Sequence, residues 1–228
     1  MVDVESEGGV TRIFLNRPEK VNALDSAVLG QLLAALLRIS ESPDLRAVVL
    51  AGRGKAFCGG ADVKELSALT AANAGRFVQN IHAVCDAIRK LPVPVIARLH
   101  GAVIGAGLEI AAACDLRVAA EGTRFAMPEV RLGIPSVVEA ALLPRLMGAG
   151  RAAWLVLTGE AIDARRAYEW GLIEEVGGVD AVDAALKAIL RNDREALRMQ
   201  KQLLQLWDEA PLATSIEKSI ELFGRAHR

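Results

Sequence analysis

Two glycine-rich segments, each lying between a β-branched stretch and an apolar stretch, restrict the fold of this chain more than any other feature. The first is FCGGAD at residues 57–62, and the second is GAGLE at residues 105–109. Strand, glycine turn and helix in that order, twice in succession, favour parallel strands with crossover helices. Because the amides of such turns point outward, the two turns predict a pair of amides that converge on one oxygen, which is an oxyanion hole.

Periodicity predicts the elements around these turns. Strands are expected at residues 11–16, 46–51, 93–99, 115–120 and 124–127, and helices at 26–39 and 71–91. From residue 137 onward the chain is expected to be mostly helical, at 137–147, 151–157, 164–170, 181–190, 194–207 and 213–223. The sequence therefore predicts a β/α core over residues 1–148 and a helical part over 149–228, which form one structural unit.

Composition narrows the class of protein. The net charge of −1 gives no electrostatic reason to expect binding to nucleic acid or to a membrane surface. The longest apolar run, residues 102–114, is shorter than a membrane span, and residues 1–9 do not resemble a secretory signal. Three cysteines without a CxxC spacing fit reduced thiols better than disulfides. We therefore expect a cytoplasmic protein.

Glu109 is the only charged residue in that apolar run. A buried carboxylate is costly and is retained mainly where chemistry needs it, although a structural acid paired with an arginine is the alternative. If Ala106 begins a helix, Glu109 lies three residues on and shares its face. Glu129 follows Pro128, which stiffens the backbone before it. Two carboxylates beside two amides can orient a water, take its proton and deliver a proton to carbon.

The ordered set of motifs resembles the crotonase, or enoyl-CoA hydratase/isomerase, superfamily. The matching segments are LNRP at 15–18, AL at 23–24, FCGGADVK at 57–64, residues 101–115, PE at 128–129, GIP at 133–135, LTG at 157–159 and GL at 171–172. The resemblance implies a crotonase-like α/β fold, with a spiral of ββα units followed by a helical trimerisation region. It also implies a homotrimer or a homohexamer.

The same resemblance implies an enoyl-CoA hydratase, which adds water across the 2,3 double bond of a trans-2-enoyl-CoA to give a 3-hydroxyacyl-CoA. The amides of Ala61 and Ala106 would bind the thioester oxygen. Glu109 is assigned to the water proton and Glu129 to the carbon proton, although the pair can act as a unit. No metal or redox cofactor is implied. The residues that match the CoA groove of the family are Lys20, Val21, Gly59, Asp62, Val63 and Lys64.

The sequence departs from the family pattern in three places. Ala106 stands where glycine is usual. Ser136 and Glu139 stand in a stretch that the family usually fills with glycines, and both are candidate pocket residues. Two interpretations of Glu139 stay open, a pocket acid and a salt-bridge partner of Arg145. The chain also stops at Arg228, short of the last helix that family members usually carry.

Several alternatives accompany this hypothesis. The nearer rival function is double-bond isomerisation on the same frame, and the more distant one is a non-catalytic CoA-binding or scaffolding protein. Cys58 is expected to be a buried thiol, because no histidine lies nearby in the sequence to make it a nucleophile. Lys201 is expected on a solvated helix face, with contact to a CoA phosphate as the alternative. His82 and His100 are expected to be packed or surface residues without metal-ligand spacing.

Overall fold

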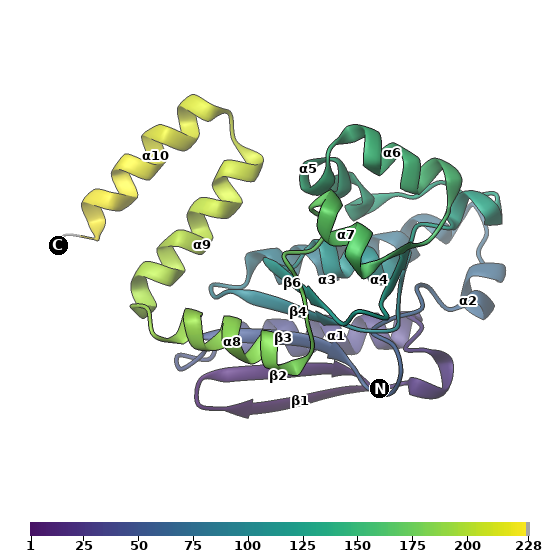
Figure 1. Cartoon of the computed structure of the whole chain (residues 1–228), viewed down its shortest axis with the longest axis horizontal. Coiled ribbons are helices and arrows are strands. Elements are labelled where there is room, and N and C mark those ends of the chain that lie inside the picture. Colours follow the sequence, from purple (N-terminus) through teal and green to yellow (C-terminus); the bar gives the residue numbers. More distant parts are fainter. Residues whose placement is uncertain (227–228) are drawn as a thin grey trace.

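A six-stranded sheet, in the order β1-β2-β3-β4-β6-β9, forms the base of the computed structural model (Figure 1). The structure describes residues 1–226, so His227 and Arg228, at the end of the predicted helical part, lie outside the described residues. The strands are β1 (Val2–Glu7), β2 (Val10–Leu15), β3 (Ala47–Gly52), β4 (Val95–Leu99), β6 (Leu116–Ala119) and β9 (Glu175–Val176). All neighbouring pairs except β1–β2 are parallel, as the repeated strand–turn–helix order predicts.

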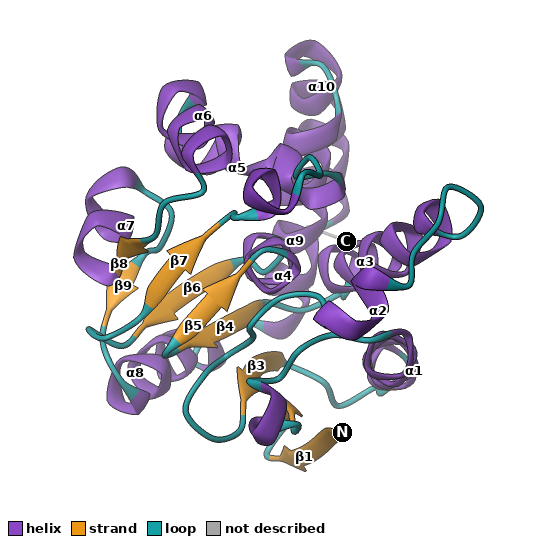
Figure 2. Cartoon of the chain, turned by 90° about the vertical axis from the view of Figure 1, so that its right-hand side faces the viewer, coloured by secondary structure: helices purple, strands orange, loops and turns teal. Residues whose placement is uncertain are grey.

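A smaller sheet lies beside the first and has the order β5-β7-β8 (Figure 2). Its strands are β5 (Ala102–Ile104), β7 (Arg124–Ala126) and β8 (Ile162–Asp163). β5 pairs with β7 in parallel, and β7 pairs with β8 in antiparallel fashion. Outside these strands, Cys58 forms an isolated parallel bridge with Val103. This bridge joins the first glycine-rich segment to the strand that leads into the second.

Helices cover the large sheet on both faces. The helical elements are η1 (Pro18–Lys20), α1 (Ser26–Ser40), α2 (Val63–Ser67), α3 (Ala74–Lys90), α4 (Ala106–Ala112), η2 (Glu129–Leu132), η3 (Val138–Leu142), α5 (Leu143–Met147), α6 (Ala149–Thr158), α7 (Ala164–Trp170), α8 (Val179–Leu190), α9 (Arg194–Glu209) and α10 (Leu212–Arg225). The elements labelled η are 3-10 helices. Asp25 caps α1 by accepting a hydrogen bond from the Val28 amide at 2.8 Å.

The alternation of side chains along β3 explains the two layers of helices. Val48 and Leu50 point into the main core, which includes residues of α1, α3 and α4. Ala47 and Val49 point to the other face, where Val182 and Leu186 of α8 cover them. Successive side chains of a strand face opposite sides, and a parallel strand that is buried on both sides reads as a continuous apolar run. All six residues of β3 are accordingly buried.

Some elements differ from the sequence-based expectation. The single helix expected at 137–147 is instead the 3-10 helix η3 followed by the short helix α5, which has Pro144 near its start. The expected boundary at residue 148 falls at Gly148, between α5 and α6. β8 and β9 lie beyond that boundary and pair with strands of the core, and β1 was not predicted. The division of the chain into a core and a helical part stays a prediction.

The helices α9 and α10 form a hairpin that projects from the body of the molecule (Figure 1). Lys201 of α9 is only 6% exposed, and its Nζ atom lies 2.6 Å from one carboxylate oxygen of Asp115 and 2.7 Å from the other. Both expectations for Lys201, a solvated helix face and a phosphate contact, are therefore wrong. Asp115 also accepts a hydrogen bond from the Val95 amide at 2.7 Å, so the pair ties α9 to the start of β4.

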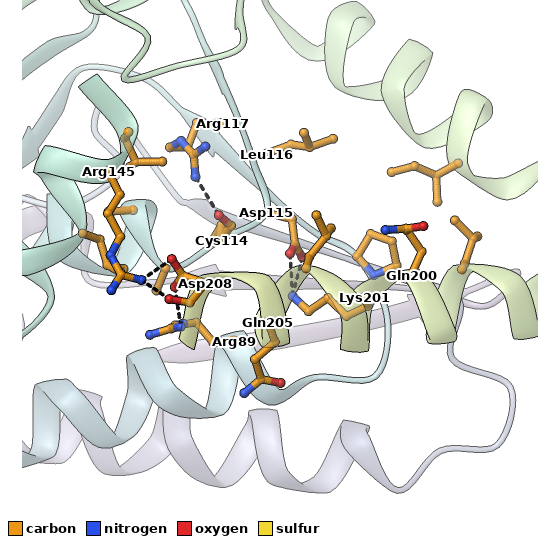
Figure 3. Close-up of a pocket in the computed structure, with 18 residues that line it drawn as sticks. Arg89, Cys114, Asp115, Leu116, Arg117, Arg145, Gln200, Lys201, Gln205 and Asp208 are labelled. Carbon is orange, nitrogen blue, oxygen red and sulfur yellow. Dashed lines mark hydrogen bonds and ion pairs between the residues drawn. The ribbon is translucent and has the colours of Figure 1, made fainter. Parts of the chain in front are cut away.

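A cavity of about 530 Å³ lies between α9 and the core (Figure 3). Figure 3 shows Asp208 between Arg89 and Arg145 at one end of this cavity, and Lys201 against Asp115 farther along. None of the predicted site residues lines it. Among residues 1–226, no helix combines the length and the hydropathy that crossing a membrane requires.

Candidate active site

The structure brings the two glycine-rich segments side by side. The Cys58 amide donates to the Ala102 carbonyl at 2.9 Å, and the Ile104 amide donates to the Cys58 carbonyl at 3.0 Å. The contact is close enough to require glycine. A Cβ at Gly60 would lie 2.9 Å from the Ile104 carbonyl oxygen, and a Cβ at Gly107 would lie 2.7 Å from the Cys58 Cβ. Both turns therefore depend on residues that lack a side chain.

The amides of Ala61 and Ala106 are free of backbone partners within the described residues. The Leu24 amide donates to the Gly60 carbonyl, and the Leu24 carbonyl accepts from the Asp62 amide, both at 2.8 Å. The intervening Ala61 amide therefore takes no part in this bridge. Ala106 is the first residue of α4, where helical amides have no partner inside the helix. Two free amides on adjacent turns fit an oxyanion hole, and that role stays a prediction.

Glu109 lies in the first turn of α4 and is only 4% exposed. Its Oε1 atom accepts a hydrogen bond from the Ala140 amide at 3.2 Å. Burial disfavours the charged form, and the nearby Glu129 and Glu139 repel it further, so the pKa of Glu109 rises to about 8 despite the hydrogen bond. No ion pair to Glu109 occurs in the described part of the chain, which removes the interpretation as an acid paired with an arginine.

Glu129 begins η2 and is half-buried. Its Oε2 atom accepts a hydrogen bond from the Ser136 hydroxyl at 2.8 Å. Its Oε1 atom lies so close to the backbone of Gly105 that a Cβ there would collide with it. Gly105 immediately precedes α4, so the structure brings Glu129 to the turn that carries Ala106 and Glu109. The two predicted catalytic carboxylates and one predicted oxyanion amide therefore occupy one place in the fold.

Glu139 is buried on η3 beside this group, 5% exposed. Its Oε1 atom lies 2.7 Å from Nδ1 of His82, which comes from α3. Arg145 pairs with Asp208 instead, so the interpretation of Glu139 as a salt-bridge partner of Arg145 is wrong, and the pocket acid stays a prediction. Sequence reasoning missed the His82 contact because the two residues are 57 positions apart. The glutamate in a normally glycine-rich stretch was the only signal that pointed to this place.

The residues predicted to line a CoA groove lie around the first glycine-rich turn. The Gly59 amide donates to the Val21 carbonyl at 2.8 Å, which joins the end of η1 to this turn. Lys20, Val63 and Lys64 are exposed there. Two lysine ammonium groups beside an exposed apolar side chain can meet a ligand that carries both phosphates and an apolar part. A groove role for these residues stays a prediction.

Asp62 differs from its predicted neighbours because the chain itself uses its side chain. It caps α2 by accepting from the Lys64 amide at 2.9 Å, and its second oxygen lies 2.9 Å from Nη1 of Arg17. Burial acts to raise the pKa of Asp62, but the Lys64 and Glu65 amides and the Arg17 guanidinium together lower it. Arg17 also pairs with Asp25 at 2.9 Å. Arg17 therefore joins the caps of α1 and α2, a role that the sequence did not predict.

Cys58 has the properties of a structural thiol. It is fully buried, and burial raises its pKa to about 12. A thiol that stays protonated is a poor nucleophile, so the nucleophile alternative is not supported. Across residues 1–226, no group of three or more His, Cys, Asp or Glu side chains has the arrangement of a metal site.

Comparison with known proteins identifies the family and the fold of this chain. The family model for enoyl-CoA hydratase/isomerase matches residues 5–227. Crystal structures of enoyl-CoA hydratases superpose on nearly the whole chain. The Mycobacterium smegmatis enzyme gives a TM-score of 0.95 at 33% identity over 99% of this chain and 90% of its own. The Bacillus anthracis enzyme gives 0.92 at 34% identity over 98% and 89%. The fold is therefore the crotonase fold.

The sequences of curated relatives agree. A probable enoyl-CoA hydratase of Mycobacterium bovis is 33% identical over 98% of this chain and 88% of its own length. A short-chain-enoyl-CoA hydratase of Clostridium acetobutylicum is 32% identical over the same two shares. A putative enoyl-CoA hydratase/isomerase of Bacillus subtilis is 37% identical over 90% of this chain and 81% of its own length. This chain belongs to the enoyl-CoA hydratase/isomerase family.

Proposed function

We propose that this chain is an enoyl-CoA hydratase, which adds water across the 2,3 double bond of a trans-2-enoyl-CoA to give a 3-hydroxyacyl-CoA. The observation that carries the proposal is a pair of glutamates, Glu109 in the first turn of α4 and Glu129 of η2 beside the glycine turn that precedes α4. Glu109 is buried there with a pKa raised to about 8, and Glu129 lies against the same turn. Water addition needs one group that takes a proton and another that gives one, so this pair supports hydration.

The amides of Ala61 and Ala106 polarise the thioester carbonyl in this proposal. When water attacks C3, the C3–O bond forms and electron density moves through C2 to the thioester oxygen. Two positioned amide donors stabilise the resulting enolate. No metal or redox cofactor enters the proposed steps. The CoA part lies along Lys20, Val21, Gly59, Val63 and Lys64, with Asp62 holding the start of α2.

The two carboxylates share one proton in the proposed cycle. Two like charges in one buried place are unfavourable, so the pair retains a proton that an isolated carboxyl would lose. The ionised member takes a proton from the attacking water, and the protonated member gives one to C2, so the pair ends the turnover with its starting proton count. The raised pKa of Glu109 puts the resting proton on Glu109, whereas the sequence-based assignment made Glu109 the base. We therefore assign the acid and the base to the pair as a unit.

A direct assay tests this function against isomerisation. Purified protein is mixed with crotonyl-CoA and with longer trans-2-enoyl-CoA esters, and the loss of enoyl absorbance is followed. In parallel, a 3-enoyl-CoA is supplied and the appearance of the 2-enoyl product is measured. We expect hydration to be the faster reaction. Isomerisation without appreciable hydration would replace the proposal with its nearer rival, and the absence of both reactions would favour a non-catalytic CoA-binding protein.

We further propose a homotrimer or homohexamer in the cytoplasm. Leu212, Ile216 and Ile220 recur at helical spacing on α10 and are 77%, 53% and 69% exposed, which supports burial against a second copy. The three cysteines are free and buried, which supports a reducing compartment. Light scattering coupled to size exclusion measures the assembly, and a monomeric mass at micromolar concentration would contradict this part of the proposal.

A further inference from the structure

A third carboxylate, Glu139, is buried beside the proposed catalytic pair. It has one strong partner, because its Oε1 atom lies 2.7 Å from Nδ1 of His82. Within the described residues its Oε2 atom is buried without a hydrogen-bond partner. A buried carboxylate with an unsatisfied oxygen is costly. Such a group needs a role that offsets its cost.

The backbone connects Glu139 directly to the reacting group. The next residue, Ala140, donates its amide to Oε1 of Glu109 at 3.2 Å. Val138, the residue before Glu139, has a φ of 40°, which is unfavourable for a β-branched side chain. A strained backbone persists only where surrounding contacts hold it. The His82–Glu139 hydrogen bond lies at that turn, immediately before the Ala140 amide that binds Glu109.

Electrostatic repulsion also links Glu139 to Glu109. The carboxylate of Glu139 contributes to the raised pKa of Glu109, after burial and Glu129. It also contributes, after burial, to the raised pKa of the Cys85 thiol, one turn along α3 from His82. Arg89 of α3 pairs with Asp208 and so does not neutralise the cluster. The titratable groups that face Glu139 or the carboxylate beside it are His82 and Cys85 from α3, Glu109 from α4 and Glu129 from η2.

We propose that Glu139, anchored by His82, is a positioning residue for Glu109. It holds the η3 turn so that the Ala140 amide binds one oxygen of Glu109, and its negative charge helps Glu109 to keep a proton at neutral pH. This inference rests on the proposed hydratase function for its meaning in catalysis. The orientation and the titration of Glu109 can both be measured without substrate.

The test titrates Glu109 in the unliganded protein. Glutamate labelled with ¹³C at the side-chain carboxyl is incorporated, and the Glu109 signal is assigned by its disappearance in Glu109→Gln. In Glu139→Gln, which keeps the shape and removes the charge, we expect Glu109 to titrate at lower pH than in the wild type, because a like charge is gone. The control is Asp86→Asn, which removes a partly exposed carboxylate from α3, the helix of His82, where Asp86 pairs with Lys90. It should leave the titration unchanged.

A second pair of variants tests the anchoring. Glu139→Ala removes the contact to His82, and His82→Ala removes it from the other side. Each should lower kcat for hydration by about tenfold or more with little change in KM, since a misplaced catalytic group costs rate more than substrate binding. Glu139→Gln, which can still accept a hydrogen bond from His82, should recover most of this loss at the optimum pH. Circular dichroism checks that each variant is folded.

The outcomes separate this inference from the function on which it rests. An unchanged Glu109 titration in folded Glu139→Gln, or a wild-type kcat in folded Glu139→Ala, would overturn the positioning role. If the wild-type protein hydrates no enoyl-CoA but the Glu109 titration moves as expected, the proposed function fails and the link between Glu139 and Glu109 stands.

Discussion

The two glycine turns and the α9–α10 hairpin differ in how their charged side chains are paired and how their apolar side chains are buried. At the second turn, Glu109 is buried without a cationic partner among the described residues, and its pKa rises in consequence. On the hairpin, the buried cation Lys201 is paired with Asp115, whereas apolar side chains of α10 remain exposed and line a groove against α9. In the first region, the burial of an unpaired carboxylate lowers the stability of the fold, as is common at active sites. The second contacts the core through Lys201 and Asp208 of α9 and leaves apolar side chains of α10 exposed.

From this difference we expect the proposed chemistry to depend on the turns and the hairpin to act as a structural element. The two turns of the proposed site are joined by backbone hydrogen bonds between Cys58, Ala102 and Ile104. The hairpin reaches the core through ion pairs that lie outside that site. Variants of the turns should therefore change the rate, and variants of the hairpin should change stability or assembly.

The largest effect is expected at the carboxylate pair. Glu109→Gln and Glu129→Gln keep the shape and remove the titratable group, so each should reduce hydration by about 10²–10⁴-fold, the contribution of a general acid or base. Initial rates with crotonyl-CoA measure this loss. Glu121→Gln changes an exposed glutamate of the β6–β7 turn and serves as the control. Wild-type rates in both pair variants would mean that the chemistry lies elsewhere.

A somewhat smaller loss is expected at the oxyanion amide. Ala106→Pro removes the donor at the first position of α4, where proline is otherwise tolerated, so turnover should fall by about 10²–10³-fold. Ala106→Gly keeps the amide and should keep the activity. The measured quantity is kcat for hydration, with circular dichroism as the check on folding. A fully active, folded proline variant would remove the Ala106 amide from the mechanism.

A change in the ion pair that joins the hairpin to the core should lower the free energy of unfolding. Lys201→Met leaves the partly buried Asp115 without its cation, and breaking a buried pair in this way costs about 3 kcal/mol. Urea unfolding measures the change in the free energy of unfolding. Lys218→Met, in an exposed pair with Glu221, should leave stability unchanged. A folded Lys201→Met variant that loses hydration at full stability would break the comparison, because the hairpin would then act on the site.

The sequence predicted the parts of this molecule that depend on local constraints. The glycine turns were recognisable because a side chain at Gly60 or Gly107 has no room, and β3 because a doubly buried strand is continuously apolar. The shape of the site beyond those turns was not predictable, since it depends on long-range pairing. His82 meets Glu139, and Lys201 meets Asp115 across 86 positions, and no local pattern marks either contact.

The 3-10 helix η3 shows the same limit. Apolar spacing over 137–147 fits a continuous helix, and periodicity alone does not reveal that Val138 adopts a φ of 40°. Contacts from α3 and α4 hold that turn, and these helices come from earlier parts of the chain. Of the two open interpretations of Glu139, the pairing with Arg145 is wrong and the pocket acid stays a prediction, and its partner His82 could be identified only in three dimensions.

The most direct test of the central claim is the rate of crotonyl-CoA hydration by the wild-type protein as a function of pH. The claim is that buried Glu109 and its neighbour Glu129 share one proton during hydration. The pKa of Glu109 is raised from 4.5 to about 8, so the pair keeps that proton below about pH 8 and loses it above. We predict substantial hydration at neutral pH that declines as the pH rises through about 8. A rate that instead increases through that range, or no hydration at any pH, would contradict the account.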